Sequence, residues 1–270
     1  EGAESFRRSR SYWEACRRYG IGFDLLDGPG AIAEVQPGLS PAFSHAGYTP
    51  DWINTRDPML WLDRLVEVFR ARGGRVDTVD VRRIRPGEDS VVLEGVGQEL
   101  RARHAVIAAG AWSRLLALSL GEKIPLETER GHNTTLPPGA FDLRTHLTLP
   151  DHGFVVSRIG RGVRIGGAVE LAGLSRPPDF RRARILLKKA GRLMPGLDTE
   201  GGTEWMGFRP SLPDSLPVIG RSRRSDRVVH AFGHGHLGLT QAAGTAELVR
   251  ALLCDEPPAL DMAPFSATRF

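Results

Sequence analysis

The sequence predicts an α/β fold in which a Rossmann-like part is joined to an α+β part built on an antiparallel sheet. The first observation is Gly233-His234-Gly235-His236-Leu237-Gly238, a G-x-G-x-x-G pattern between an apolar strand over 227–232 and an alanine-rich helix over 239–253. The second is the continuous apolar run 105–109, typical of a strand buried on both faces of a parallel sheet. The third is the glycine- and threonine-rich composition between 125 and 205, which favours antiparallel strands.

The glycine pattern lies too close to the C-terminus for its usual place in a dinucleotide-binding unit. Such a unit continues into a second strand and an acidic residue about 20 residues further on, which contacts a ribose. The chain ends at Phe270, so we expect the pattern to form the last loop of a larger cofactor site instead. In that position the N-terminus of the following helix faces the cofactor.

The other elements follow from hydrophobic period and from glycine and proline positions. The expected helices cover residues 5–19, 58–72 and 180–194. The expected strands cover residues 21–26, 76–84, 91–93, 99–101, 153–157 and 164–167, with a loop-rich connection over 30–40 and a turn over 160–162.

The helix over 58–72 is the most clearly marked of these elements. Asp57 is a suitable N-cap, and Pro58 suits the first helical turn, where no N–H donor is needed. Apolar residues recur on one face at helical spacing, namely Leu62, Leu65, Val66 and Phe69. The pattern therefore predicts an amphipathic helix.

Composition excludes several classes of protein. A hydrophobic content of 41% and a charged content of 25% are ordinary for a globular protein. The sequence has no apolar run of the roughly 20 residues that a membrane helix needs, and Cys16 and Cys254 suggest no disulfide framework. A cytoplasmic location is the default expectation. The net charge of +4 comes from scattered arginines, which favours a solvated surface over a nucleic-acid partner.

Two short stretches indicate a ligand site. Ala108-Ala109-Gly110-Ala111 ends the strand over 105–109 in residues with almost no side chain, which allows a ligand to approach the backbone. Ordinary packing between a strand and a helix explains the same residues equally well. In Trp205-Met206-Gly207-Phe208-Arg209-Pro210, the arginine lies among apolar and ring residues and would require an anionic partner. That partner is either a ligand carboxylate, held by two hydrogen bonds, or a structural carboxylate such as Asp214.

Taken together, these motifs resemble the D-amino acid oxidase-like family of flavoproteins. The resemblance rests on the stretch 205–220, the glycine loop, the close at Arg269-Phe270, and further upstream on Arg130-Gly131-His132 and Asp57-Pro58. It covers nearly the whole chain in the right order. Bacterial D-amino acid dehydrogenases are the most similar members, followed by glycine and sarcosine oxidases.

The resemblance also implies that the sequence begins after the family's first βαβ unit, which holds the FAD pyrophosphate. We therefore expect an FAD/NAD(P)-binding Rossmann-like domain that is N-terminally incomplete. Its parts are 48–118 and 206–270, while 119–205 forms an antiparallel-sheet substrate-binding domain and 1–47 a helical, connecting part of that domain.

The family's functional positions can be carried over one by one. The backbone of Val81 would meet the adenine, and Ala109 and Gly110 would form the small turn beside the cofactor. Backbone N–H groups of the glycine loop and the helix start would face the flavin ring; these residues are His234, Gly235, His236, Leu237, Gly238, Leu239 and Thr240.

On the substrate side, the resemblance assigns Arg209 to the substrate carboxylate. His236 would be a second polar, catalytic residue over the substrate, although a surface histidine explains it as well. Phe154 and His132 stand where relatives carry tyrosines, so substrate preference differs if those positions line the site.

The implied reaction is the oxidative deamination of a D-amino acid, with FAD as cofactor and no metal. A hydride passes from Cα to flavin N5, and the imino acid hydrolyses to a keto acid and ammonia.

The alternatives are oxidation of glycine, sarcosine or a D-proline type of amine, and a flavin-free, non-catalytic subunit. Oxygen, a quinone and an electron-transfer protein all fit as electron acceptor, and a quinone-linked enzyme would lie at the inner membrane face. A homo-oligomer, or a second chain that supplies the missing FAD-binding segment, is compatible with an incomplete sheet.

Overall fold

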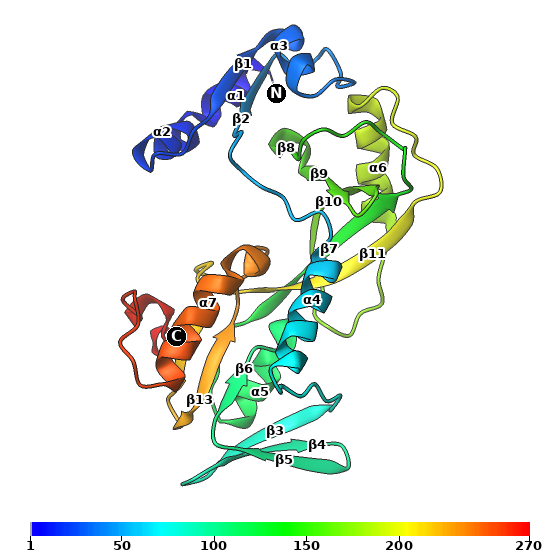
Figure 1. The fold of residues 1–270 in the computed structure, drawn as a ribbon. Coiled ribbons are helices and arrows are strands. Elements are labelled where there is room, and N and C mark those ends of the chain that lie inside the picture. Colours follow the sequence, from blue (N-terminus) through cyan, green and yellow to red (C-terminus); the bar gives the residue numbers. More distant parts are fainter. Residues whose placement is uncertain (1) are drawn as a thin grey trace. The chain divides into compact units, whose positions relative to one another are not determined.

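The computed structural model describes residues 2–270 and divides the chain into two compact units (Figure 1). Unit 1 comprises residues 1–75, 131–169 and 178–206, and unit 2 comprises residues 76–130, 170–177 and 207–270. Among the described residues, no helix has the length and apolar content to cross a bilayer. The units are defined by packing alone, so the assignment of cofactor and substrate domains stays a prediction.

The N-terminal part of unit 1 differs from the sequence expectation in its helices and in its strands: the strand expected over 21–26 covers 24–27, and the strand over 45–48 was not expected. The single helix expected over 5–19 is two helices, α1 (Ala3–Arg8) and α2 (Arg10–Arg18). They separate at Ser9. The Ser9 hydroxyl donates a hydrogen bond to the carbonyl of Phe6 in the preceding turn. The loop-rich connection expected over 30–40 is wrong for residues 30–35, which belong to α3 (Gly28–Val35), a helix with a proline in its first turn. Residues 36–40 contain no helix or strand, as expected. Strands β1 (Asp24–Asp27) and β2 (His45–Tyr48) flank α3 and pair antiparallel.

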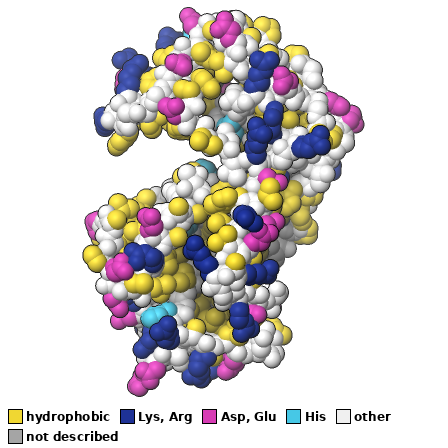
Figure 2. All heavy atoms as spheres, viewed as in Figure 1, with side chains coloured by type: hydrophobic (Ala, Val, Ile, Leu, Met, Phe, Trp, Pro, Cys, Tyr) yellow, Lys and Arg dark blue, Asp and Glu magenta, His cyan; other side chains and the backbone are white. Residues whose placement is uncertain are grey.

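The helix α4 (Pro58–Ala71) confirms the predicted start. The Asp57 carboxylate accepts a hydrogen bond from the N–H of Leu60 at 3.0 Å. None of its residues is buried, however: Leu62 is 48% exposed, Leu65 45% and Phe69 51%. Hydrophobic side chains are visible at the surface in Figure 2. Helical spacing therefore predicted the element correctly, but about half of the surface of these apolar side chains stays exposed in the described chain.

The largest sheet has the strand order β11-β7-β10-β9-β8. Its strands are β7 (Glu127–Leu136), β8 (Leu147–Leu149), β9 (Phe154–Ile159), β10 (Gly162–Leu171) and β11 (Thr203–Ser211). The pairing of Gly162 with Ile159 confirms the predicted antiparallel hairpin and its turn. The helix α6 (Arg181–Leu193) matches its prediction and buries Leu186 in the unit 1 core, together with Val156, Ile165 and Met194.

Unit 2 contains two three-stranded sheets, ordered β3-β4-β5 and β12-β13-β6. The first sheet, built from β3 (Val81–Pro86), β4 (Val91–Gly95) and β5 (Gln98–Ala102), confirms the predicted hairpin, although β3 begins five residues later than expected. The second contains β6 (Ala105–Ile107), β12 (Val218–Ser222) and β13 (Ser225–Phe232). Its strands β6 and β13 run parallel, as predicted. Burial of β6 on both faces was a wrong expectation, because Val106 is 40% exposed.

Helices and a buried hydrophobic core complete unit 2. The short helix η1 (Gly110–Trp112) leads into α5 (Ser113–Ser119), and α7 (Gly238–Leu253) matches the predicted C-terminal helix. Ile107 and Phe232, from the two parallel strands, belong to the core. The core therefore holds these strands in place, and with them the loops that follow.

Candidate functional site

The loops predicted to face a cofactor leave adjacent parallel strands at the same edge. His230 of β13 pairs with Ile107 of β6, and each strand then continues into one of the predicted loops. Ligands of open α/β sheets bind at the carboxyl ends of such strands. The structure thus brings Ala109 and Gly110 to the same edge as the loop 233–238.

Gly110 has the backbone geometry that its predicted role requires. Its φ is +54°, in the left-handed region that favours glycine. A Cβ at this position would meet no atom within 4 Å. The backbone conformation accounts for this glycine, and the open space beside it leaves room for a ligand to approach the backbone. Ala109 precedes the short helix η1, and its carbonyl accepts from the N–H of Trp112 at 3.1 Å.

The glycine loop is held from within the protein at two of its N–H groups. The N–H of Gly235 donates to the carbonyl of Pro210 at 2.8 Å, and that of Leu237 donates to His234 at 3.0 Å. These two groups are therefore engaged, which corrects the expectation that the whole loop offers N–H donors to a ligand. Gly233 is required for a different reason, since a Cβ there would lie 2.4 Å from Leu212.

The start of α7 provides the remaining donors. The helix begins at Gly238 without a side-chain cap, and the first N–H that it uses internally belongs to Gln241. The first-turn N–H groups of a helix have no partner inside it and form its positive end. Gly238, Leu239 and Thr240 are therefore the positions best placed to donate to an anionic ligand.

The two histidines of the loop have different environments. The Nε2 atom of His234 forms a hydrogen bond with the Thr245 hydroxyl at 3.0 Å, and burial lowers the pKa of His234. Its side chain thus ties the loop to α7. His236 is exposed, as a surface histidine would be, and its catalytic role stays a prediction.

Arg209 lies on β11 beside the glycine loop, because the next residue, Pro210, accepts the hydrogen bond from Gly235. The side chain is half-buried. Burial lowers the pKa of Arg209, and the carboxylate of Glu129 on the neighbouring strand β7 opposes that shift. A structural ion pair with Asp214 was the alternative, and the structure gives Asp214 a different partner.

That partner is Arg269, which lies 2.6 Å from the carboxylate of Asp214 through its Nε atom. The hydrogen bond from Arg269 holds the pKa of Asp214 below its usual value. The motif residue Asp214 therefore anchors the C-terminal segment, and Arg269 stacks in turn against the ring of Phe270.

Three other predicted residues lie elsewhere in the fold. Phe154 and His132 belong to unit 1, where Phe154 is 2% exposed within the hydrophobic core. His132 is fully buried on β7, and its ring meets that of Phe180 edge-on at 6.3 Å. Val81 is half-buried at the start of β3, outside the sheet that carries the two loops. Their roles stay predictions.

Sequence reasoning missed a buried ionic cluster in unit 2. The Nε2 atom of His230 donates to the Glu122 carboxylate at 2.7 Å, the Ser222 hydroxyl donates to it at 3.0 Å, and the N–H of Arg223 donates at 2.7 Å. Burial alone would raise the pKa of Glu122, but the hydrogen bonds from His230 and Arg223 prevail and bring it to about 2. A partner 108 residues away leaves no local sequence signal.

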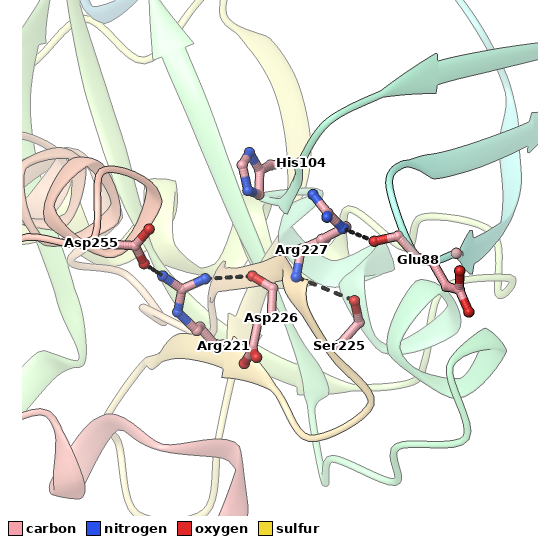
Figure 3. Close-up of a pocket in the computed structure, with 8 residues that line it drawn as sticks. Glu88, His104, Arg221, Ser225, Asp226, Arg227 and Asp255 are labelled. Atoms are coloured by element: carbon pink, nitrogen blue, oxygen red, sulfur yellow. Dashed lines mark hydrogen bonds and ion pairs between the residues drawn. The ribbon is translucent and has the colours of Figure 1, made fainter.

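A polar pocket of unit 2 lies at the opposite end of the parallel strands (Figure 3). Its arginines are engaged within the protein: Arg221 pairs with Asp255 at 2.6 Å, and Arg227 donates to the carbonyl of Glu88 at 2.7 Å. The remaining lining residues are Gly87, His104, Ser225 and Asp226. This pocket is therefore separate from the edge that carries the two loops.

Comparison with solved structures identifies the fold as that of the Rossmann-like FAD-dependent oxidoreductases. Glycine oxidase from Geobacillus kaustophilus superposes with a TM-score of 0.86 over 99% of this chain and 72% of its own, at 26% identity. L-proline dehydrogenase from P. horikoshii has the same fold, with a TM-score of 0.86 at 19% identity, covering 100% of this chain and 74% of its own.

Sequence comparison then places the chain in a family. It belongs to the FAD dependent oxidoreductase family, whose pattern matches residues 1–252. A D-amino-acid oxidase of Bradyrhizobium diazoefficiens is 34% identical over 96% of this chain and 62% of its own length. A D-amino acid dehydrogenase of Paramagnetospirillum magneticum is 36% identical over 98% and 65%. The chain thus spans somewhat less than two thirds of the length of these relatives.

Proposed function

We propose that this chain forms the substrate-binding and flavin-ring part of an enzyme that oxidises D-amino acids with FAD. The observation that carries the proposal is the position of Arg209 in the chain. Arg209 directly precedes Pro210, whose carbonyl accepts a hydrogen bond from the N–H of Gly235 in the glycine loop. This contact brings the strand that carries Arg209 next to the glycine loop, which supports a carboxylate-binding role for Arg209 beside a flavin-binding loop. The two D-amino acid enzymes among the relatives support the same substrate class.

The residues present fit the ring end of a flavin. Gly110 leaves open space above its backbone, and the first turn of α7 offers uncapped N–H groups from Gly238, Leu239 and Thr240. These residues would hold the ring, with Ala109 beside it and the backbone of Val81 near the adenine. When bound, FAD supplies the hydride acceptor. The pyrophosphate would be held by a segment outside these 270 residues, as the length of the relatives suggests.

In this proposal, Arg209 binds and orients the substrate. Its planar guanidinium binds the substrate carboxylate through two hydrogen bonds, which fixes the direction of the Cα–H bond. Orientation and exclusion of water then lower the barrier to hydride loss, so no dedicated acid–base pair is required. His236 would contact the substrate from the exposed loop, and the imino acid would hydrolyse in water to a keto acid and ammonia.

A second candidate is oxidation of glycine or of a secondary amine such as sarcosine or D-proline. The similarity to glycine oxidase favours it. The same Arg209 contact serves both candidates, because all these substrates carry a carboxylate.

Flavin titration followed by anaerobic reduction tests the proposal. FAD is titrated into this chain and into a form extended by the N-terminal segment of its relatives, with flavin fluorescence as the readout. We expect tight binding by the extended form and bleaching by D-amino acids, with little effect of their L-enantiomers. Bleaching by glycine or sarcosine alone would favour the second candidate. Absence of flavin binding by the extended form would contradict the proposal and support a non-catalytic subunit.

A further inference from the structure

Arg130 on β7 carries a fully buried guanidinium that contacts three residues of unit 2. It has 0% exposure. Its Nη2 atom donates to the carbonyl of Arg176 at 2.7 Å, and its Nη1 atom lies 3.6 Å from the Glu170 carboxylate on β10. The guanidinium also lies over the ring of Phe208 on β11, at 5.7 Å from the ring centre. A side chain on the central of three strands therefore contacts residues on both neighbours.

The alternation of side chains along a strand defines the face on which Arg130 acts. Successive residues point to opposite faces of a sheet. Phe208 shares a face with Arg130, because the two side chains are in contact. The next residues along each strand, Arg209 and Glu129, share the other face, where the Glu129 carboxylate acts on Arg209. Arg130 thus supports β11 from the side opposite to the proposed substrate site.

Phe208 is held from a second direction by Trp112. The two rings meet edge-to-face, with centres 5.4 Å apart and planes at 70°. Trp112 ends the short helix that begins at Gly110, the glycine proposed to lie beside the flavin. Edge-to-face and cation–π contacts restrict where a ring can sit. Phe208 therefore links the turn at Gly110, the buried Arg130 and the strand that carries Arg209.

We propose that Arg130 is a positioning residue for the substrate carboxylate. By fixing Phe208, it fixes the backbone of β11 at Arg209, so that the Arg209 guanidinium meets the substrate already oriented. The inference rests on the proposed function of Arg209. Stability alone is a weak explanation for Arg130, because replacing a buried ion pair by apolar side chains of similar volume often leaves the free energy of unfolding unchanged or raises it. Its Nε atom, moreover, has no hydrogen-bond partner among the described residues.

Two variants separate positioning from simple structural support. Arg130→Lys keeps the positive charge but loses the planar contact with Phe208. The double variant Arg130→Met/Glu170→Leu replaces the pair by apolar side chains, which generally preserves folding. Arg101→Met is the matched control, because Arg101 is an exposed arginine on β5 that bonds only to Ser90 in the described structure. All are made in the form that binds FAD.

Two measurements are compared, the kinetics of anaerobic flavin reduction and amide hydrogen exchange over residues 207–211. We expect both Arg130 variants to raise the KM for a D-amino acid by about tenfold or more, since small misplacements of a binding group have effects of this size. The limiting rate should stay within about twofold, and exchange over 207–211 should accelerate. The control should match the wild type in both.

Other results have distinct meanings. An unchanged KM and unchanged exchange in both variants would overturn the positioning role. A smaller amplitude of flavin reduction with unchanged KM and limiting rate would also overturn it, because that result indicates only loss of folded enzyme. If D-amino acids fail to reduce the wild-type flavin, the proposed function fails. The exchange measurement would then still decide whether Arg130 fixes β11.

Discussion

Unit 2 contains two buried ionic clusters that differ in how completely their polar atoms are engaged. Around Glu122, both carboxylate oxygens accept short hydrogen bonds, from His230, Ser222 and Arg223. The Arg130 guanidinium, by contrast, contacts the carbonyl of Arg176, the Glu170 carboxylate at 3.6 Å and the ring of Phe208. The first arrangement is what a stabilising cluster requires. The second is less complete and lies against the strand of the proposed substrate site, so its main contribution is expected in ligand binding.

The largest effect should come from breaking the Glu122 cluster. Glu122→Ala removes the acceptor of three hydrogen bonds and leaves His230 buried without its partner. Loss of one partner of a buried pair typically lowers the free energy of unfolding by about 3–5 kcal/mol. Urea unfolding measures this change. A loss of unfolding free energy below about 1 kcal/mol, or a raised KM at constant stability, would contradict the stabilising role that distinguishes the Glu122 cluster from the Arg130 cluster.

Acid should weaken the same cluster. The folded-state pKa of Glu122 is about 2, below its ordinary value of 4.5. The cluster's contribution is therefore complete above pH 4.5 and is lost as the pH falls toward 2. The difference corresponds to about 3 kcal/mol. Urea unfolding at several pH values should show this loss in the wild type and a flatter profile in Glu122→Gln. Equal profiles in the two proteins would contradict the assignment.

The smallest effect is expected at the loop. His236 is exposed, so His236→Ala removes at most one hydrogen bond to the substrate. Such a bond contributes about 0.5–1.5 kcal/mol, which predicts a rise in KM of between about twofold and tenfold with unchanged stability. Steady-state kinetics and thermal unfolding measure the two quantities. A large loss of kcat would instead make His236 central to the chemistry.

The sequence predicted local elements better than long-range contacts. The helices α4, α6 and α7 and the hairpin of β9 and β10 follow from spacing and turn residues, which act locally. The exposure of the apolar face of α4 could not be predicted, because burial depends on which segments pack against a helix. The break at Ser9, where the hydroxyl and the N–H both bond to the carbonyl of Phe6, also lies within a pattern that predicted one continuous helix.

The candidate site shows the same limit. The glycine loop and Arg209 were found from their sequence patterns, and the parallel pairing of β6 and β13 then brought the predicted loops to one edge. The partner of Asp214 was not predictable, since Arg269 lies 55 residues away. Likewise, the bond from His234 to Thr245 depends on how α7 packs against the loop.

The most direct test of the central claim is the anaerobic reduction of the FAD-bound, extended protein by a D-amino acid in the wild type and in Arg209→Ala. Arg101→Ala serves as the control. We predict that kcat/KM falls by an amount equivalent to about 2–5 kcal/mol in Arg209→Ala, the usual loss for one half of a buried charge pair. The control should be unchanged. An unchanged kcat/KM in Arg209→Ala, with reduction otherwise normal, would contradict the assignment of Arg209 to the substrate carboxylate.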